Sequence, residues 1–311
     1  MLSALVIFRP ARRRLESLEH AARALGTGRT DVRADESGGD EVSGLAKTFN
    51  QMAAVIQARD AALAAADRAR RQLLADVSHE LMTPLTAIRG YTQTLAMREL
   101  AMDDATRARY FEIVDKETYK LEAIIGDLLD LARLEGGGGT LSIERVSVQE
   151  LFGHIADRHE RTLHARGIQL KADVPADLEL RADLQRAEQA LQNIVSNAIR
   201  HTPDGGRVDI RAVDEGDAVR ITVRDTGPGI PPEHLPHIFD RFYKVDASRT
   251  AAGSGLGLSI VRAIVERHGG HVGAENALDG GAVFHIVLPK AGPTDGTTPR
   301  PGAEENRGVG A

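Results

Sequence analysis

Two amphipathic segments mark the first part of the chain. From Pro10 to Gly26, and again from Val42 to Ile56, apolar residues recur at alternating steps of three and four, with a connector rich in Gly and Asp between the two runs. This spacing is typical of helices whose apolar stripe packs against another helix. The stripe residues are Leu15, Leu18, Ala22 and Leu25, then Val42, Leu45, Phe49, Met52 and Ile56. We expect two helices that need helical partners, the first beginning at Pro10, because proline is favoured at the first helical position.

Two longer stripes follow. The stretch Ala58–Arg71 contains no helix breaker, so we expect the second helix to continue into a stripe that ends at Leu95. After a turn near Ala101–Asp104, a further stripe runs from Phe111 to Ala132. The stripe residues are Leu74, Val77, Leu81, Pro84, Ile88, Tyr91 and Leu95, then Phe111, Val114, Thr118, Leu121, Ile125, Leu128 and Ala132. Two long antiparallel helices with one apolar stripe each bury it best as a dimeric four-helix bundle.

The pattern changes after Gly136–Gly139, where four glycines in a row predict a flexible tether. Strand signals occur at Val208–Val213 and Val219–Val223. The segments with helical spacing are Val148–Ala165, Asp183–Arg200 and Gly255–His268. We therefore expect an α/β domain over residues 141–290, followed at 291–311 by a disordered tail that shows no periodicity.

Composition narrows the class of function. The 311 residues are 42% hydrophobic and 27% charged, which fits more than one soluble domain and neither a wholly disordered chain nor a multi-span membrane protein. A net charge of −6, from 39 basic and 45 acidic residues, has the wrong sign for a protein that coats nucleic acid, so no nucleic-acid partner is expected. The absence of cysteine excludes disulfides, thiolate zinc sites, iron–sulfur clusters and a cysteine nucleophile.

The first residues carry a short membrane signal. Met1–Phe8 is apolar and is followed at once by a basic run that includes Arg9 and Arg12–Arg14. A spanning helix needs about 20 apolar residues, so this stretch cannot cross a bilayer alone. An apolar run followed by basic residues matches the cytoplasmic end of a transmembrane helix. We expect residues 1–9 to be the end of a span in the cell membrane and the remainder to be cytoplasmic; the alternative is an ordinary hydrophobic cluster at a helix start.

One histidine stands opposite an apolar stripe. At about 100° per residue, His79 lies on the helix face away from Val77 and Leu81, with Thr83 one turn further along. An exposed histidine flanked by Glu80 and followed at i+4 by a hydroxyl suits a nucleophile; the alternative is an ordinary structural or surface histidine. A zinc site of the H-E-x-x-H type is excluded, because Thr83 stands where the second histidine would be.

Two further polar patterns suit a nucleotide. Asn193, Asn197 and Arg200 have the spacing i, i+4, i+7 and share one helix face, where amide oxygens can hold Mg²⁺ and a cation can meet phosphate; the alternative is a solvated polar face. Asp225 directly follows a strand, and the glycines of Asp225–Gly229 let the backbone turn tightly beside a planar ligand. The Asp225 carboxylate can accept a hydrogen bond from an exocyclic amine.

A second glycine-rich stretch, Gly253–Gly257, opens a helix, which is where free N–H groups bind phosphate. It is not a dinucleotide fingerprint, because Leu258 and Ile260 stand where the third glycine would be required. It is not a P-loop either, because it lacks Gly-Lys-Ser/Thr.

Taken in order, these segments resemble a sensor histidine kinase of a two-component system. The boxes are the phosphoacceptor box at His79, the N box Asn193–His201, the first glycine box Asp225–Gly229, the aromatic box Phe239–Phe242 and the second glycine box Gly253–Gly257. The hairpin before them resembles a HAMP linker through Pro10 and Asp40-Glu41, although any dimerising helical hairpin shows similar stripes. The implied divisions are 10–62 for the HAMP-like linker, 63–135 for the dimerisation and histidine phosphotransfer hairpin, 136–140 for the linker and 141–290 for an α/β sandwich ATP-binding domain.

The resemblance implies a role for each residue near the histidine. His79 is expected to be phosphorylated by ATP, Glu80 to orient the imidazole or take its proton, and Thr83 to serve in dephosphorylating the partner. Met82 departs from the family pattern, which has Arg or Lys there, and so removes a cation near the transferred phosphoryl group. Homodimerisation and transfer to a response regulator are implied too, whereas transfer within or across the dimer stays open.

The resemblance also assigns the nucleotide site. Asn197, helped by Asn193, is expected to hold Mg²⁺ against the phosphates of ATP, and Arg200 to contact phosphate. His201 stands where the family has Tyr or His. Asp225 is expected to recognise the adenine amino group by accepting a hydrogen bond from it. The glycines that line the pocket or accommodate the triphosphate, under a lid around Val245–Ser254, are Gly227, Gly229, Gly253, Gly255 and Gly257.

Two rival functions use the same nucleotide-binding fold. Chaperone, topoisomerase and mismatch-repair ATPases hydrolyse ATP instead of transferring its phosphoryl group, and the helical hairpin that carries His79 argues against them. An ATP-binding signalling scaffold, with mainly phosphatase or dimerisation output, stays open because of Met82.

Overall fold

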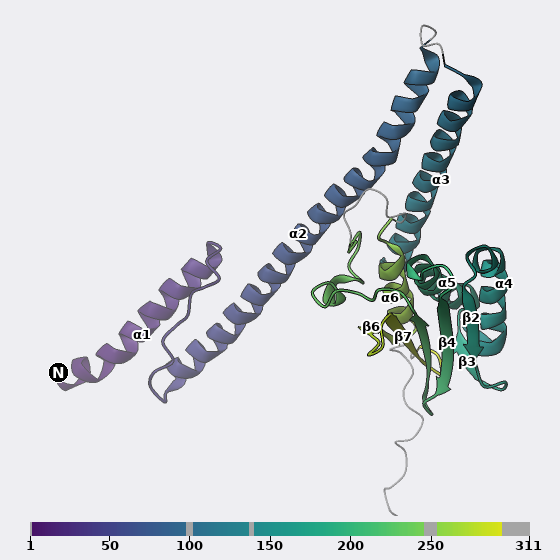
Figure 1. Ribbon diagram of the computed structural model, residues 1–311. Coiled ribbons are helices and arrows are strands. Elements are labelled where there is room, and N and C mark those ends of the chain that lie inside the picture. Colours follow the sequence, from purple (N-terminus) through teal and green to yellow (C-terminus); the bar gives the residue numbers. More distant parts are fainter. Residues whose placement is uncertain (1, 98–101, 137–139, 246–253, 294–311) are drawn as a thin grey trace, which may run out of the picture. The chain divides into compact units, whose positions relative to one another are not determined.

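The computed structural model describes residues 2–97, 102–136, 140–245 and 254–293 (Figure 1). It divides into a first unit, Met1–Ser78, and a second unit, His79–Ala311. Several expectations fall wholly or partly outside the described residues: the turn near Ala101–Asp104, the glycine tether, the lid around Val245–Ser254, Gly253 and the tail at 291–311.

The first unit contains helix α1, Leu2–Gly26, and the beginning of α2, which spans Glu41–Ala96. The expectation that the first helix begins at Pro10 was wrong, because Pro10 lies inside α1. A proline removes one backbone hydrogen bond from a helix, and the residues before Pro10 include no further proline or glycine. No helix in the described part of the chain is both long and apolar enough to cross a membrane.

The core of the first unit consists mainly of alanine side chains. Its buried cluster is Leu18, Ala21, Ala34, Ala46, Phe49 and Ala53. Only part of the predicted stripes is therefore buried, since Leu45 and Met52 stay 54% and 50% exposed. The Asn50 amide fastens the connector by accepting from the Ala34 N–H at 2.8 Å and donating to the Ala34 carbonyl at 2.9 Å. The Arg14 guanidinium donates to both carboxylate oxygens of Asp40 and lowers the pKa of that carboxyl.

Helix α3, Asp104–Glu135, begins where the Asp103 carboxylate accepts from the Thr106 N–H at 2.8 Å. Its apolar residues occupy more than the one predicted stripe. Phe111 and Ile125 of that stripe are 58% and 44% exposed. The buried residues of α3 are Ile124, Leu131 and Leu134, which lie outside the predicted stripe.

Residues 144–245 and 254–290, here called the sheet domain, form an α/β sandwich, as the sequence predicts. The elements are β1 Glu144–Ser147, α4 Val148–Arg166, β2 Gln169–Asp173, β3 Glu179–Ala182, α5 Leu184–His201, β4 Arg207–Asp214, β5 Ala218–Asp225, the 3₁₀ turn η1 Leu235–His237, α6 Gly257–Arg267, β6 His271–Asn276 and β7 Ala282–Pro289. The five-stranded sheet has the order β2-β4-β5-β7-β6, in which only the β2–β4 pair is parallel, and β1 pairs separately with β3.

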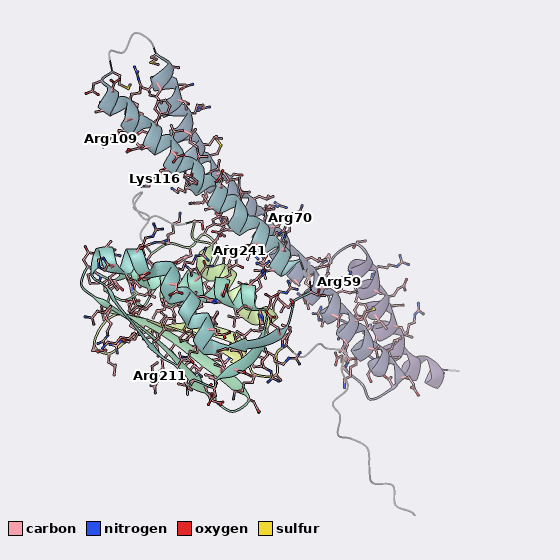
Figure 2. The ribbon with its side chains drawn as sticks, turned by 90° about the vertical axis from the view of Figure 1, so that its right-hand side faces the viewer. Arg59, Arg70, Arg109, Lys116, Arg211 and Arg241 are labelled. Atoms are coloured by element: carbon pink, nitrogen blue, oxygen red, sulfur yellow. The ribbon has the colours of Figure 1, made fainter. Side chains whose placement is uncertain are left out.

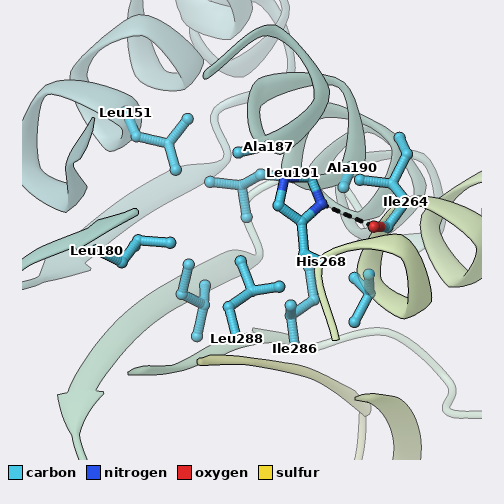
Figure 3. A pocket seen from close by; sticks show the side chains of 11 residues that line it. Leu151, Leu180, Ala187, Ala190, Leu191, Ile264, His268, Ile286 and Leu288 are labelled. Carbon is cyan, nitrogen blue, oxygen red and sulfur yellow. Dashed lines mark hydrogen bonds between the residues drawn. The ribbon is translucent and has the colours of Figure 1, made fainter. Parts of the chain in front are cut away.

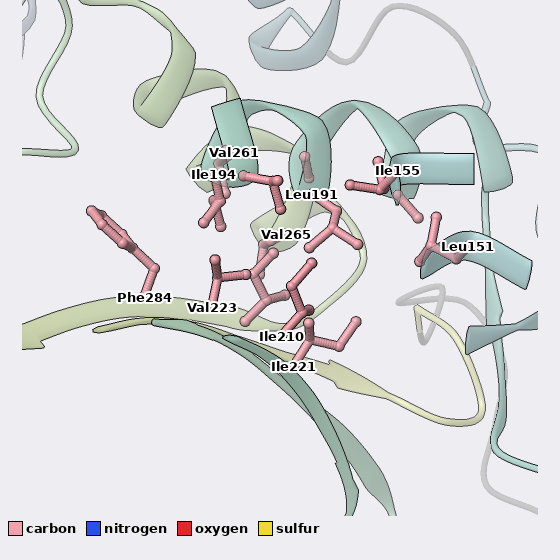
Figure 4. Close-up of a cluster of buried hydrophobic side chains, with 14 of the residues drawn as sticks. Leu151, Ile155, Leu191, Ile194, Ile210, Ile221, Val223, Val261, Val265 and Phe284 are labelled. Carbon is pink, nitrogen blue, oxygen red and sulfur yellow. The ribbon is translucent and has the colours of Figure 1, made fainter. Parts of the chain in front are cut away.

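The helices α4, α5 and α6 cover one face of this sheet (Figures 1 and 4). Figure 4 shows Leu191 and Ile194 of α5 pointing toward Ile221 and Val223 of the central strand β5. Residues alternate along β5 between buried and half-buried positions, as the period of a strand requires. The core therefore fixes β5 and α5, the two elements that end in Asp225 and His201.

Caps explain where the helices begin and end. The Asp183 carboxylate accepts from the Arg186 N–H at 3.1 Å, so α5 begins one residue after the predicted start. Gly167 ends α4 with a left-handed φ of 61°. Gly255 has a φ of +75° and cannot be helical, so α6 begins at Gly257 instead of Gly255.

His268 joins the end of α6 to the start of α5. Its Nδ1 donates to the Ile264 carbonyl at 2.8 Å, as Figure 3 shows. Its Nε2 accepts from the Asp183 N–H at 3.1 Å. The small cavity that His268 lines is otherwise apolar, with Leu151, Leu191 and Ile286 among its walls. This cavity is part of the core and contains none of the predicted site residues.

A pH-dependent contact links α4 and α5. His154 Nδ1 lies 2.5 Å from a Glu188 carboxylate oxygen, which raises the pKa of His154 above its ordinary value of 6.5. Stabilisation from this pair is therefore complete below pH 6.5 and is lost as the pH rises through the folded-state pKa. His154→Gln should lower the thermal midpoint at pH 5.5 by no more than about 2 °C, since the pair is largely exposed, and leave it unchanged at pH 9. His271→Gln, on the edge strand β6, is the control; equal effects at both pH values would contradict the assignment.

Candidate functional site

Asp225 ends the central strand and is buried, with 3% of its surface exposed. Its Oδ1 accepts the N–H of Gly227 at 2.8 Å and of Ala282 at 3.1 Å. These two backbone donors compensate the burial of a charge. They also fix the orientation of the carboxylate, which leaves Oδ2 to accept from a ligand.

The glycines after Asp225 stand where no side chain fits. A Cβ at Gly227 would lie 2.6 Å from the His201 carbonyl oxygen, which is closer than carbon can approach. Gly229 has a left-handed φ of +78°. The Asn276 amide fixes the turn, accepting from the Ile230 N–H at 2.8 Å and donating to the Ile230 carbonyl at 2.6 Å. Because these glycines have no side chains, backbone atoms alone line this side of the site, and a flat ligand can approach them closely.

The polar face of α5 meets the second glycine stretch. Asn193 Nδ2 donates to the Gly257 carbonyl at 3.1 Å, and Asn193 and Asn197 are half-buried. Arg200 lies on the same face and is exposed. Partial burial of its side chain lowers the pKa of Arg200, and no acidic side chain among the described residues offsets that effect. A crowded guanidinium without a carboxylate partner suits a ligand anion.

The aromatic box contacts Gly255. Phe242 adopts a left-handed φ of 60°, which is unusual for a residue with a side chain. A Cβ at Gly255 would lie 2.7 Å from the Phe242 carbonyl carbon. The two segments pack backbone to backbone, so Gly255 is required by this contact as well as by its own φ of +75°.

The phosphoacceptor box lies on α2. His79 is 81% exposed, as the stripe predicts, and its Nδ1 lies 3.9 Å from Glu80 Oε1. Thr83 is exposed one turn along, and its hydroxyl donates to the His79 carbonyl at 3.1 Å. Pro84 stands inside α2 and has no N–H for the Glu80 carbonyl, so the helix lacks one backbone bond beside His79.

The structure gathers most of the predicted residues into one region. Asn193 reaches Gly257, and Gly227 contacts both Asp225 and the His201 backbone. Gly253 lies outside the described residues, and no described contact joins His79 itself to this region. Within the described ranges, no three His, Asp or Glu side chains form a group that could hold a metal ion.

Three participating residues were not identified from the sequence. Asn276 and Ala282 come from β6 and β7, and Lys244 follows the aromatic box. An Asp-Gly pair, Asp279-Gly280, predicts the turn between those strands, and this was the available signal for Ala282. Asn276 and Lys244 have no local signal, because their roles depend on contacts with distant segments.

Comparison with protein families matches three consecutive parts of the chain. Residues 6–58 match the HAMP domain, and residues 69–137 match the His Kinase A (phospho-acceptor) domain. Residues 182–292 match the family described as histidine kinase-, DNA gyrase B-, and HSP90-like ATPase.

Individual relatives agree with this order. The chain is 38% identical to "Signal transduction histidine-protein kinase AfsQ2" of Streptomyces coelicolor over 93% of this chain and 53% of that protein. It is 34% identical to "Sensor histidine kinase YclK" of Bacillus subtilis over 89% of this chain and 59% of that protein. The chain thus spans between half and three fifths of the length of these relatives.

Solved structures show the same fold. Histidine kinase ThkA, in its complex with response regulator protein TrrA, matches with a TM-score of 0.59 and 30% identity, over 71% of this chain and 61% of that chain. Acinetobacter baumannii histidine kinase AdeS matches in fold with a TM-score of 0.57, over 68% of this chain and 98% of that chain, at 24% identity.

Proposed function

Because this chain belongs to the sensor histidine kinases of two-component systems, we propose that it transfers the γ-phosphoryl group of ATP to His79 and then to an aspartate of a response regulator. The observation that carries the proposal is the exposed His79 with the Glu80 carboxylate beside it, in a chain that also contains the buried Asp225 pocket. Dephosphorylation of the same regulator is proposed as a second activity.

Adenine would bind against the first glycine box. The free carboxylate oxygen of Asp225 would accept from the exocyclic amine, while the bare backbone at Gly227 and Gly229 lets the ring approach. Arg200 would neutralise phosphate oxygens, since it is exposed on the polar face of α5 and no acidic side chain in the described part of the chain pairs with it. Gly255 and Gly257 would leave room for the triphosphate at the start of α6.

Magnesium would enter with the nucleotide. Mg²⁺ takes oxygen ligands and keeps several waters, so one protein oxygen beside the phosphates suffices. Asn197 supplies such an amide oxygen on the same face of α5 as Asn193, and so fits the ion. When bound, Mg²⁺ neutralises phosphate charge.

At His79, one ring nitrogen of the neutral imidazole attacks the γ-phosphorus. The bond from that phosphorus to the oxygen bridging to the β-phosphate breaks, and ADP leaves. The other ring nitrogen loses its proton to Glu80; Nδ1 is the nitrogen that faces this carboxylate, at 3.9 Å. This leaves Nε2 as the attacking atom. The protein's contribution is to position the groups and neutralise charge.

The test of this function uses γ-labelled ATP with Mg²⁺. Transfer to His79 would give a phosphoprotein that is labile in acid and stable in base, and the label would then pass to a receiver domain. A scaffold with mainly phosphatase or dimerisation output, which Met82 favours because it is an exposed apolar side chain where the family has a cation, would bind ATP without becoming labelled.

Thr83 should separate the two activities. Its hydroxyl can reach a water attacking a phosphoaspartate docked beside His79, but it is too weakly basic to be needed for attack on ATP. Thr83→Ala should therefore autophosphorylate close to normally and dephosphorylate the regulator at least about tenfold more slowly. Thr83 is exposed, so the thermal midpoint should hardly change. Equal loss of both activities in a folded dimer would show that Thr83 supports the site in general.

A side chain at Gly227 should block the nucleotide. A Cβ there would lie 2.6 Å from the His201 carbonyl oxygen and 2.9 Å from Asp225 Oδ1. Relief of these contacts would shift the turn that holds the Asp225 carboxylate, so Gly227→Ala should weaken binding of a non-hydrolysable ATP analogue about tenfold or more in calorimetry. The control is Gly153→Ala in α4, where a Cβ has nothing within 4 Å. Parent-like affinity of Gly227→Ala would place the nucleotide elsewhere.

Two associations complete the proposal. The apolar residues left exposed on α2 and α3 would be covered by a second copy in a homodimer; they are Leu74, Leu85, Phe111, Ile125 and Leu129. Membrane association is proposed from the apolar Met1–Phe8 and the basic residues that follow it.

A further inference from the structure

A lysine of the sheet domain contacts the carboxylate beside the phosphoacceptor. Lys244 Nζ lies 2.7 Å from Glu80 Oε2, and these side chains are only 26% and 20% exposed. The other oxygen of the same carboxylate, Oε1, lies 3.9 Å from His79 Nδ1. Glu80 thus stands between a lysine and the histidine, with one oxygen directed at each. A charged hydrogen bond of this length holds a carboxylate more firmly than a neutral one would.

Lys244 is brought to Glu80 by a set of contacts along one face of α3. Asp127 accepts from the Ser254 hydroxyl at 2.8 Å, and Asp130 accepts from Arg186 at 3.2 Å. Leu131 and Leu134 are buried in the same cluster as the core of the sheet domain. Figure 2 labels Arg241, whose guanidinium pairs with Glu135 at the end of α3. The spacing of these α3 residues, at steps of three and four, places them on one side of the helix.

No residue of α2 near Glu80 supplies a cation, since residues 72–88 include no lysine or arginine. Lys244 therefore brings a cation to Glu80 from a different part of the chain.

We propose that Lys244 is a positioning residue that orients Glu80 toward His79. This inference rests on the proposed function. Its consequence is that Glu80 is correctly oriented only while the sheet domain lies against α3, so proton removal from His79 is coupled to that docking. Lys244 itself contacts neither His79 nor, in this role, the nucleotide.

The test compares initial rates of His79 labelling in the full chain across a range of ATP concentrations. Lys244→Ala should lower the maximal rate about tenfold with unchanged KM for ATP, because positioning of a general base is lost and nucleotide binding is not. Lys244→Arg should keep most of the rate.

The matched control is Lys290→Ala, which breaks another lysine–carboxylate pair of the sheet domain, to Asp214 at 2.5 Å, and should label like the parent. A carbodiimide, which joins contacting carboxylates and amines with loss of water, should link Glu80 to Lys244 in the unmodified chain. Circular dichroism and analogue binding verify that each variant is folded, and Lys244→Gln replaces the alanine variant if it is not.

Each result decides the inference. A parent-like rate for Lys244→Ala, a raised KM, or failure of Lys244→Arg to keep the rate would overturn it. If the parent itself is not labelled, the proposed function fails instead. The crosslink then still reports on the contact, and its absence would overturn the inference by itself.

Discussion

Replacement of His79 by Gln is expected to abolish labelling of the chain by γ-labelled ATP. Glutamine keeps a polar side chain of similar reach but has no nitrogen lone pair that can attack phosphorus, so the covalent step cannot occur. The position is 81% exposed, and within the described ranges the only ionic neighbour of the His79 side chain is Glu80 at 3.9 Å, so the fold should be unaffected.

The control for this variant is His20→Gln, another exposed histidine on a helix, which should be labelled like the parent. Analogue binding to His79→Gln should also match the parent, because His79 lies outside the region that holds Asp225 and Asn193. Label that persists in His79→Gln would remove the assignment of the phosphoacceptor. Loss of both label and nucleotide binding would show that the variant is damaged more widely.

Asp225→Asn is expected to weaken binding of ATP about 10- to 100-fold, and to relax its preference for adenine over guanine. An amide oxygen can keep the bonds from the N–H groups of Gly227 and Ala282, so the turn should persist. The amide nitrogen then replaces the free carboxylate oxygen and presents a donor to the adenine amine, which is also a donor. Losing a hydrogen bond to a charged group costs about 1.5–3 kcal/mol.

Calorimetry with analogues of ATP and GTP measures both effects. Asp217→Asn, in the exposed turn before β5, is the control and should bind as the parent does. Asn197→Ala should instead weaken only the part of the affinity that depends on Mg²⁺. If Asp225→Asn and Asn197→Ala both bind like the parent, the nucleotide binds outside the region assigned to it.

The sheet domain was the most predictable part of the chain, because its signals are local. The spacing of Leu191, Ile194 and Ala198 predicts the buried face of α5, and the helix runs where it was expected within one residue at each end. The site boxes are equally local: Asp225 follows its strand directly, and the three polar residues of α5 share a face by spacing alone.

The packing of the helices in the first part was less predictable, because an apolar stripe does not indicate which partner covers it. The hairpin core uses Ala21, Ala46 and Ala53, while larger stripe residues such as Leu45 stay exposed. Alanine carries little hydrophobic signal, but it permits close packing of two helices. The start of α1 was missed because Pro10 was interpreted as a first residue, whereas a long helix can contain it.

Contacts between distant segments had no signal at all. Asn276 is an unremarkable residue at the end of β6 until it meets Ile230, and Lys244 is one lysine among many basic residues until it meets Glu80. The face of α3 that joins the sheet domain was missed for the same reason, since Leu131 and Leu134 lie beside the predicted stripe and not in it. Such residues become identifiable only when the fold brings their partners together.

The central claim is that His79 receives the phosphoryl group, and mapping the modified residue tests it most directly. The chain is incubated with Mg-ATP, digested at alkaline pH to preserve a phosphoramidate, and analysed by peptide mass spectrometry. The account predicts one phosphorylated peptide, with the group on His79 and lost on brief acid treatment. Phosphate on a serine, threonine or other histidine, or an unmodified His79 in protein that binds ATP, would contradict it.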